Sequence, residues 1–235
     1  MKALSSMATR HVLADLGELA LAAGHPPIEI ESVGGVDAAT RVAAGERVDL
    51  VFLALGALQK LAADGHVDPA TVTPLLGSQV AVAVPTDGVD AAAWDGGAAF
   101  AGPDQLQAAL LSAANVGYST GPSGTALLRQ ISGWGLDAAL AGRLVQARPG
   151  IPVARLLAER EVSLGFQQLS ELVGQPGIRI LGVMPLGCEI DTVFAGAVAA
   201  CATDPSRASE VLSLYASKAA TSRIEQHSFT PLWAS

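Results

Sequence analysis

Residues 28–54 read IEIESVGGVDAATRVAAGERVDLVFLA, and this stretch decides the fold class. Apolar and polar residues alternate at its start, which predicts a strand over 28–35. A helical pattern follows over 36–46 and stops at Gly45. Residues 48–54 then form a continuous apolar run, as expected of a strand covered on both faces. A strand, a helix and a second strand in this order are typical of a parallel α/β sheet.

The same alternation extends over the rest of the chain. We expect strands over 2–6, 78–85, 115–119, 142–150 (with a turn), 162–167, 177–185 and 191–202, and helices over 7–24, 55–67, 103–113, 123–135, 151–161, 168–174 and 204–229. A stretch rich in Gly and Asp, residues 86–104, connects two similar blocks. We therefore predict two α/β lobes, residues 1–80 with 195–235 and residues 81–194, joined by crossing strands.

Composition and charge exclude several classes of function. Half of the 235 residues are apolar and 15% are charged, which suits a packed core. The formal net charge of −8 makes nucleic acid an unexpected partner, because there is no basic surplus to neutralise phosphates. No run reaches the roughly 18 apolar residues of a membrane span. Whether the chain forms a homo-oligomer is left open.

The N-terminal residues lack the pattern of a secretory signal, which needs an unbroken apolar stretch. Polar and charged residues interrupt it at Ser5, Ser6, Arg10, His11 and Asp15. We expect a cytoplasmic protein, or a periplasmic one if a signal peptide has been removed from this sequence.

Two cysteines, Cys188 and Cys201, are too few for a disulfide framework and have no metal-binding spacing. We expect both to be buried apolar thiols. No cluster of carboxylates and histidines falls at the loops described next, so neither a metal nor a cofactor is expected.

Small residues with hydroxyl, amide or backbone donors follow the predicted strands. These junctions are Ser5-Ser6, 32–35, 119–125, 148–152 and Gln167-Gln168. Open parallel sheets bind ligands beyond the carboxyl ends of their strands, where helix N-termini expose N–H groups. Hydroxyl and amide groups add neutral donors. Five such loops at equivalent junctions predict a shared anion-binding cleft.

Residues 119–125, STGPSGT, allow two interpretations. Ser123 or Thr120 could cap the following helix. Alternatively, Ser123, Gly124 and Thr125 could bind an anion at the helix N-terminus. We expect this loop to serve both purposes.

Several segments, taken in order, resemble the molybdate-binding protein family. They are LSSMATR, SVGGVDAATRVAAGERVDLVFLA, SQVAVAVP, GPSGTAL and VSLGFQQLSEL, and they span essentially the whole chain. Proteins of that family are type II solute-binding proteins, in which two α/β lobes close on an oxyanion held by neutral donors. The resemblance implies a type II periplasmic-binding-protein-like fold with a ligand cleft between the lobes.

The resemblance also implies the positions of the oxyanion ligands. They fall near Ser5 or Ser6, Gly34 or Gly35, Ser123, Ile151 and Gln168. The glycines stand where the family has serines, and Gln168 stands where it has a tyrosine. The loss of these hydroxyl donors disfavours molybdate and tungstate and leaves room for a larger, planar ligand.

Within this family, the variant LSSMATR…GYSTGPSG…LGFQQLSEL is most similar to the aconitate isomerase branch. That resemblance implies an allylic 1,3-proton shift that interconverts trans- and cis-aconitate. Donors would stabilise charge that builds on carboxylate oxygens. A cation would help to hold a tricarboxylate, and Arg10 and Arg148 are the candidates.

Ser6, Arg10 and His11 are the candidate catalytic residues. Histidine suits proton transfer near neutral pH, although His11 points about 100° away from Arg10 on a helix. The alternative function is a solute-binding protein for an oxyanion or a small carboxylate, serving a transporter or sensing. In both cases the expected partner is a small anionic ligand.

Overall fold

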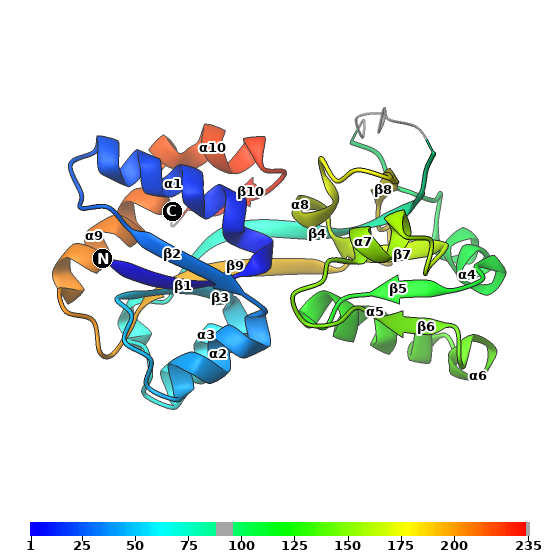
Figure 1. The fold of residues 1–235 in the computed structure, drawn as a ribbon, viewed down its shortest axis with the longest axis horizontal. Coiled ribbons are helices and arrows are strands. Elements are labelled where there is room, and N and C mark those ends of the chain that lie inside the picture. Colours follow the sequence, from blue (N-terminus) through cyan, green and yellow to red (C-terminus); the bar gives the residue numbers. More distant parts are fainter. Residues whose placement is uncertain (88–95, 234–235) are drawn as a thin grey trace. The chain divides into compact units, whose positions relative to one another are not determined.

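The structure is a computed structural model that describes residues 1–87 and 96–233 (Figure 1). Part of the predicted connecting stretch, residues 88–95, lies outside the described residues. The chain divides into two compact units: unit 1 is Met1–Ser78 with Val193–Ser235, and unit 2 is Gln79–Thr192. Two long strands, β4 (Thr73–Pro85) and β9 (Asp191–Val198), have residues in both units.

A mostly parallel sheet forms the centre of unit 1. Its strands lie in the order β2 (Glu29–Val33), β1 (Lys2–Ser6), β3 (Leu50–Ala54) and β9. β1 pairs in parallel with β2 and β3, whereas β9 runs antiparallel to β3. Four of the five β3 residues are buried, which explains why this strand is apolar without alternation. The strand–helix–strand unit predicted over 28–54 is confirmed.

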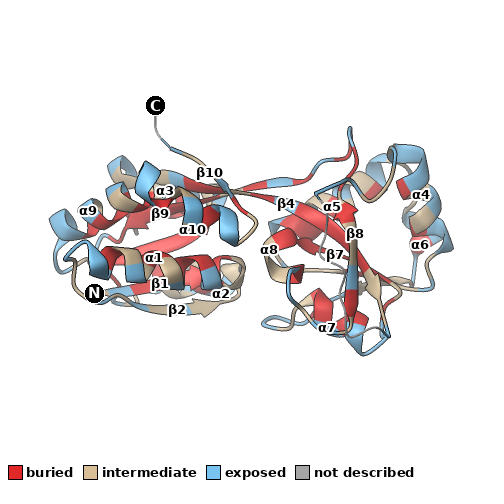
Figure 2. Ribbon diagram, turned by 90° about the horizontal axis from the view of Figure 1, so that it is seen from above, coloured by how far each residue is buried: buried red, intermediate tan, exposed pale blue. Residues whose placement is uncertain are grey.

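Helices cover both faces of this sheet (Figure 1). They are η1 (Met7–Thr9), α1 (Arg10–Ala22), α2 (Gly35–Ala43), α3 (Leu55–Ala63), η2 (Pro69–Thr71), α9 (Pro205–Tyr215), η3 (Lys218–Ala220) and α10 (Thr221–Gln226). One core joins α1, α9 and α10 to the side chains of Leu50 and Phe52, and the other joins α2 and α3 to Leu4 and Val51. Figure 2 shows the buried strands of this layer in red.

The single helix predicted over 204–229 is wrong. The chain leaves the helix after Tyr215 and restarts at Ser217, whose hydroxyl accepts a hydrogen bond from the Ala219 amide at 3.2 Å. Serine is a strong helix N-cap, so it favours a new helix start over continuation. The residues that follow end in β10 (Thr230–Pro231), which pairs with β4 and was not predicted.

The strands of unit 2 pair in both parallel and antiparallel directions. The parallel strands are β6 (Leu144–Gln146), β5 (Val116–Tyr118) and β7 (Leu164–Gln168), and β4 pairs antiparallel with β7 and β8 (Ile178–Val183). The helices of unit 2 are α4 (Pro103–Ser112), α5 (Pro122–Gly133), α6 (Asp137–Leu140), α7 (Val153–Ala158) and α8 (Leu169–Leu172). The helices α4, α5 and α6 share one core with the strands, and α7 and α8 share another. Figure 1 shows α5 and α7 on opposite sides of β5. The helix α6 was not predicted.

Two smaller predictions are corrected by the structure. The strand expected over 191–202 ends at Val198, because the chain turns there and the Ala202 amide donates to the Ala199 carbonyl at 3.0 Å. As a result Cys201 is exposed rather than buried, whereas Cys188 is buried as predicted. Burial raises the pKa of the Cys188 thiol.

Candidate functional site

In unit 1 the carboxyl ends of β2, β1 and β3 lead directly into helices. β2 and β1 pair in register up to Val33 and Ser6, so the two strands end side by side. The helices α2 and α3 begin immediately after β2 and β3, and neither has a side chain hydrogen-bonded at its N-cap. The first turns of both helices therefore carry N–H groups that precede the first intrahelical hydrogen bond. In α2 that first bond runs from the Ala38 amide to the Gly34 carbonyl at 2.8 Å.

Ser5 and Ser6 point to opposite faces of β1, as successive strand residues do. Ser5 is 0% exposed, and its hydroxyl lies 2.7 Å from the hydroxyl of Ser32 on β2. Ser6 is 6% exposed, and its hydroxyl lies 3.4 Å from that of Thr9. Thr9 donates in turn to the Ser6 carbonyl at 3.0 Å. The predicted pair is thus split between two hydroxyl clusters.

Neither the backbone conformation nor the available space requires glycine at positions 34 and 35. Gly34 has φ of −56° and ψ of 136°, a conformation open to any residue. A Cβ atom on Gly34 would lie 3.9 Å from the Asp37 Cβ, and one on Gly35 would lie 3.7 Å from the Ser6 Cβ. Both are ordinary contacts. The contact at Gly35 also shows that the start of α2 lies against Ser6, as the predicted site requires.

Arg10 and His11 belong to a cluster of charged and aromatic groups at the start of α1. The Arg10 guanidinium donates to His11 Nε2 at 2.9 Å. The His11 ring stacks on that of His227, with centroids 6.5 Å apart, and His227 Nε2 lies 2.7 Å from an Asp15 carboxylate oxygen. Partial desolvation and the charges of Arg10 and His227 lower the pKa of His11, against an opposing effect of Asp15. The structure therefore links His11 to the C-terminal segment of unit 1.

In unit 2, the loop 119–125 is not built as a side-chain cap. The N-cap residue of α5 is Gly121, with no side-chain hydrogen bond, so the prediction that Ser123 or Thr120 caps the helix is wrong. Ser123 is 4% exposed, and its hydroxyl lies 2.8 Å from the Ser119 hydroxyl. Ser123 thus has no capping role, and its hydroxyl bonds to that of Ser119.

Gly124 lies where no other residue fits. A Cβ atom there would come 1.9 Å from the Ser119 carbonyl oxygen, far inside contact distance. The Thr125 amide donates to the Gly121 carbonyl at 3.2 Å and begins the helical pattern. Of the residues after Pro122, the amides of Ser123 and Gly124 therefore precede the first intrahelical bond of α5.

The glutamines at the end of β7 have different tasks. Gln167 accepts a hydrogen bond from the Val153 amide at 2.7 Å and so caps the start of α7. Gln168 donates to the Thr192 hydroxyl at 2.7 Å. Both side chains are buried. Gln168 thus lies at the end of β7, with its amide oriented by Thr192 on β9.

The predicted binding loop at residues 148–152 offers fewer hydrogen-bond donors. Arg148 is exposed, and its carbonyl accepts the Ile151 amide at 2.9 Å. The Ile151 N–H is therefore used within the loop. Four residues that bond to predicted ligands, Thr9, Ser32, Ser119 and Thr192, were left out of the predicted site. A signal existed for Thr9, Ser32 and Ser119, which are hydroxyl residues in or next to the same loops, but Thr192 is distant in sequence.

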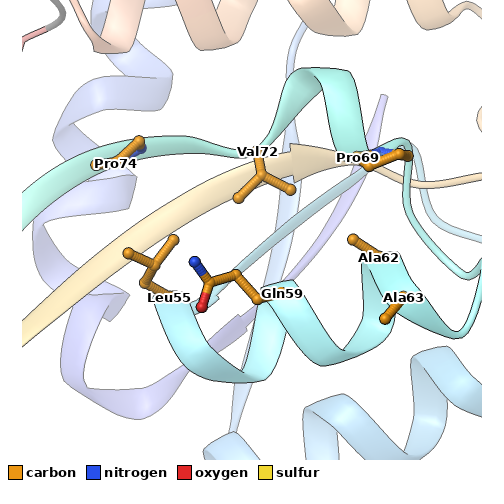
Figure 3. Close-up of a pocket in the computed structure, with 7 residues that line it drawn as sticks. All are labelled: Leu55, Gln59, Ala62, Ala63, Pro69, Val72 and Pro74. Carbon is orange, nitrogen blue, oxygen red and sulfur yellow. The ribbon is translucent and has the colours of Figure 1, made fainter.

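A groove on unit 1 lies apart from these residues. It has a volume of about 610 Å³ and is lined by Leu55, Gln59, Ala62, Ala63, Pro69, Val72 and Pro74 (Figure 3). None of the predicted site residues lines it. Among the described residues there is no cluster of three metal-ligating side chains. None of the helices in the described part of the chain is long and apolar enough to cross a membrane.

Comparison with known sequences decides the family. The profile of the bacterial extracellular solute-binding protein family matches residues 2–230. This chain belongs to that family. Its sequence is also similar to aconitate isomerase from a Pseudomonas species, with 33% identity over 195 residues, which cover 82% of this chain and 71% of that protein.

Solved structures show that this member of the solute-binding family has the expected fold. The periplasmic molybdate-binding protein of Azotobacter vinelandii superposes with a TM-score of 0.75 at 17% identity, covering 98% of each chain. The sulfate-binding protein of Mycobacterium tuberculosis gives a TM-score of 0.72 at 15% identity, covering 98% of this chain and 86% of that one. The predicted resemblance and the predicted periplasmic-binding-protein-like fold are confirmed.

Proposed function

We propose that this protein is an isomerase that shifts the carbon–carbon double bond of an unsaturated polycarboxylate, with trans-aconitate and cis-aconitate as its substrate pair. The similarity to aconitate isomerase over most of the chain carries the proposal. The donor groups at the strand ends support it, because they are neutral and buried. A fold shared with binding proteins does not decide between binding and catalysis.

The reaction needs one proton removed and one proton returned. A base takes a proton from the methylene group, the double bond migrates, and a proton is added at the other end of the three-carbon unit. Negative charge builds on the adjacent carboxylate oxygens in between, so fixed hydrogen-bond donors should dominate the catalysis.

Two sets of donors would serve the substrate carboxylates. In unit 1 they are the Ser6 hydroxyl, the amides of the first α2 turn, and Ser5 through its partner Ser32. In unit 2 they are the Ser123 hydroxyl, the amides of Ser123 and Gly124, and the Gln168 amide. Thr125 in the loop 119–125, and Arg148 and Ile151 in the loop 148–152, would be further substrate-binding residues.

Ser6, Arg10 and His11 are the proposed catalytic residues. The Arg10 guanidinium donates a hydrogen bond to Nε2 of His11, so the imidazole that it contacts is neutral. The lowered pKa of His11 keeps this ring neutral at physiological pH. Of these three residues, Ser6 is at the end of β1 and lies against the start of α2.

A steady-state assay with chromatographic detection of both isomers tests the proposal. We expect wild-type protein to reach the same equilibrium ratio from trans-aconitate and from cis-aconitate. Ser6→Ala should lower kcat by about 100-fold or more if its hydroxyl acts in the transition state. The variant Ser213→Ala is the control, because that hydroxyl is exposed and donates to the Ser209 carbonyl of its own helix. Absence of interconversion from either side would refute the proposed activity.

The second candidate function is binding of an oxyanion or a small carboxylate for transport or sensing. The family match and the molybdate- and sulfate-binding proteins of the same fold favour it. A thermal-shift series with molybdate, tungstate, sulfate and aconitate separates the two. Strong stabilisation by one inorganic oxyanion, without turnover of aconitate, would favour this function.

The cytoplasmic location expected from the sequence stays a prediction. Fractionation of cells that produce the protein from its natural gene would test it.

A further inference from the structure

The hydroxyls of Ser5 on β1 and Ser32 on β2 form a pair in which one residue can touch a ligand and the other cannot. Ser5 is 0% exposed, so no ligand atom can reach its side chain in this structure. Ser32 is partly exposed and faces the same side of the sheet, since the two residues pair in register. Their hydroxyl oxygens lie 2.7 Å apart.

Either hydroxyl of this pair can donate to the other. Ser5 Oγ has two acceptors within reach, Ser32 Oγ at 2.7 Å and the Ser6 carbonyl at 3.4 Å. The first is the ordinary length of a strong O–H···O bond and the second is at the weak limit. Ser5 can therefore donate to Ser32 while Ser32 donates to a third group. In that arrangement the single proton of Ser32 is available for another acceptor.

We propose that Ser32 is a substrate-binding residue that donates a hydrogen bond to a substrate carboxylate, and that Ser5 is the positioning residue behind it. This inference rests on the proposed function, because it takes a polycarboxylate as the ligand. It replaces Ser5 by Ser32 as the hydroxyl that contacts substrate.

The chemistry of the pair fits an anion. A hydroxyl that accepts one hydrogen bond becomes a better donor, since hydrogen bonds in a chain polarise one another. Ser32 is also the penultimate residue of β2, shortly before the start of α2, whose first amides are donors as well. A carboxylate only accepts hydrogen bonds, so Ser32 must donate to it, and the Ser5 hydroxyl can then donate to Ser32.

A double-mutant cycle tests the proposal by titration calorimetry with trans-aconitate and by steady-state kinetics. Ser32→Ala should weaken binding about 10-fold or more, since a hydrogen bond to a charged group is lost. Ser32→Thr keeps the hydroxyl at a strand end and should bind within about 3-fold of wild type. Ser5→Ala should weaken binding less than Ser32→Ala does, and should cause no further loss in the Ser32→Ala background.

The control is Ser112→Ala, which removes an exposed hydroxyl that bonds to a carbonyl of its own helix. Melting temperatures of all variants show whether they fold. Wild-type affinity in Ser32→Ala, or equal and additive losses for Ser5→Ala and Ser32→Ala, would overturn the inference alone. Wild-type protein that binds trans-aconitate without turnover would refute the isomerase and leave the assignment of Ser32 standing. Failure of wild-type protein to bind trans-aconitate would overturn both.

Discussion

At the scale of single residues, the side chains of the site act in pairs. Ser5 pairs with Ser32, Ser123 with Ser119, and Gln168 with Thr192, in each case at 2.7 or 2.8 Å. Buried polar groups without partners are costly, so a neighbour of this kind stabilises a buried donor. Each pair holds its two polar groups at hydrogen-bond distance from each other.

Ser123→Ala tests the role of the α5 start. We expect about a 10-fold loss of affinity for trans-aconitate with little change in melting temperature, because Ser123 is not the cap of the helix. Calorimetry and thermal unfolding measure the two quantities. A fall in stability of about 1 kcal/mol with unchanged affinity would instead indicate a capping role.

His11 should make stability depend on pH. Its pKa in the folded chain is lowered below the ordinary 6.5, so the unfolded chain binds the proton more tightly. Stability is therefore retained above pH 6.5 and falls as the pH drops below that value. Thermal unfolding at several pH values between about 7.5 and 5.5 should show a smaller decline for His11→Gln than for wild type. An identical decline in both proteins would contradict this account.

At the scale of helices and strands, much of the fold could be predicted from local pattern. The alternation in β2, the apolar run of β3 and the glycines that end α1 and α2 follow from residue periodicity and from φ values of +90° at Gly24 and +84° at Gly45. The break at Ser217 was missed, because an amphipathic pattern continues through it. β10 was missed because a two-residue strand depends on its distant partner, the strand β4.

The candidate site could be predicted only in part, because some of its contacts join segments that are far apart in the sequence. The loops follow from sequence, because they come after recognisable strands. The roles of individual residues do not: Gln167 and Gln168 are neighbours, yet one caps α7 and the other bonds to Thr192. Such roles depend on contacts between segments far apart in the chain.

Close packing of α7 on its sheet gives a prediction at this scale. A Cβ atom on Gly165 would lie 2.7 Å from a Leu157 methyl and 2.8 Å from a Val153 methyl. We expect Gly165→Ala to destabilise the protein by about 1–3 kcal/mol through overpacking. Gly133→Ala is the matched control, because it is helical with no atom within 4 Å of the new Cβ, and it should be neutral or stabilising. Denaturant unfolding measures both, and equal stabilities would contradict the packing argument.

At the scale of the whole molecule, the fold of an extracellular solute-binding protein carries a sequence similar to that of an isomerase. The same neutral donors that can hold an anion can also stabilise charge developing on a carboxylate. Conversion of a binding protein to an enzyme on this scaffold would then need few new groups. Turnover of aconitate, and not affinity for it, therefore distinguishes an isomerase from a binding protein.

Proton NMR of trans-aconitate in H₂O buffer with a catalytic amount of wild-type protein tests for this turnover most directly. The account predicts that cis-aconitate signals grow over many turnovers, and that Ser6→Ala slows their growth while Ser213→Ala does not. An unchanged trans-aconitate spectrum, with substrate at a concentration that saturates binding, would contradict it.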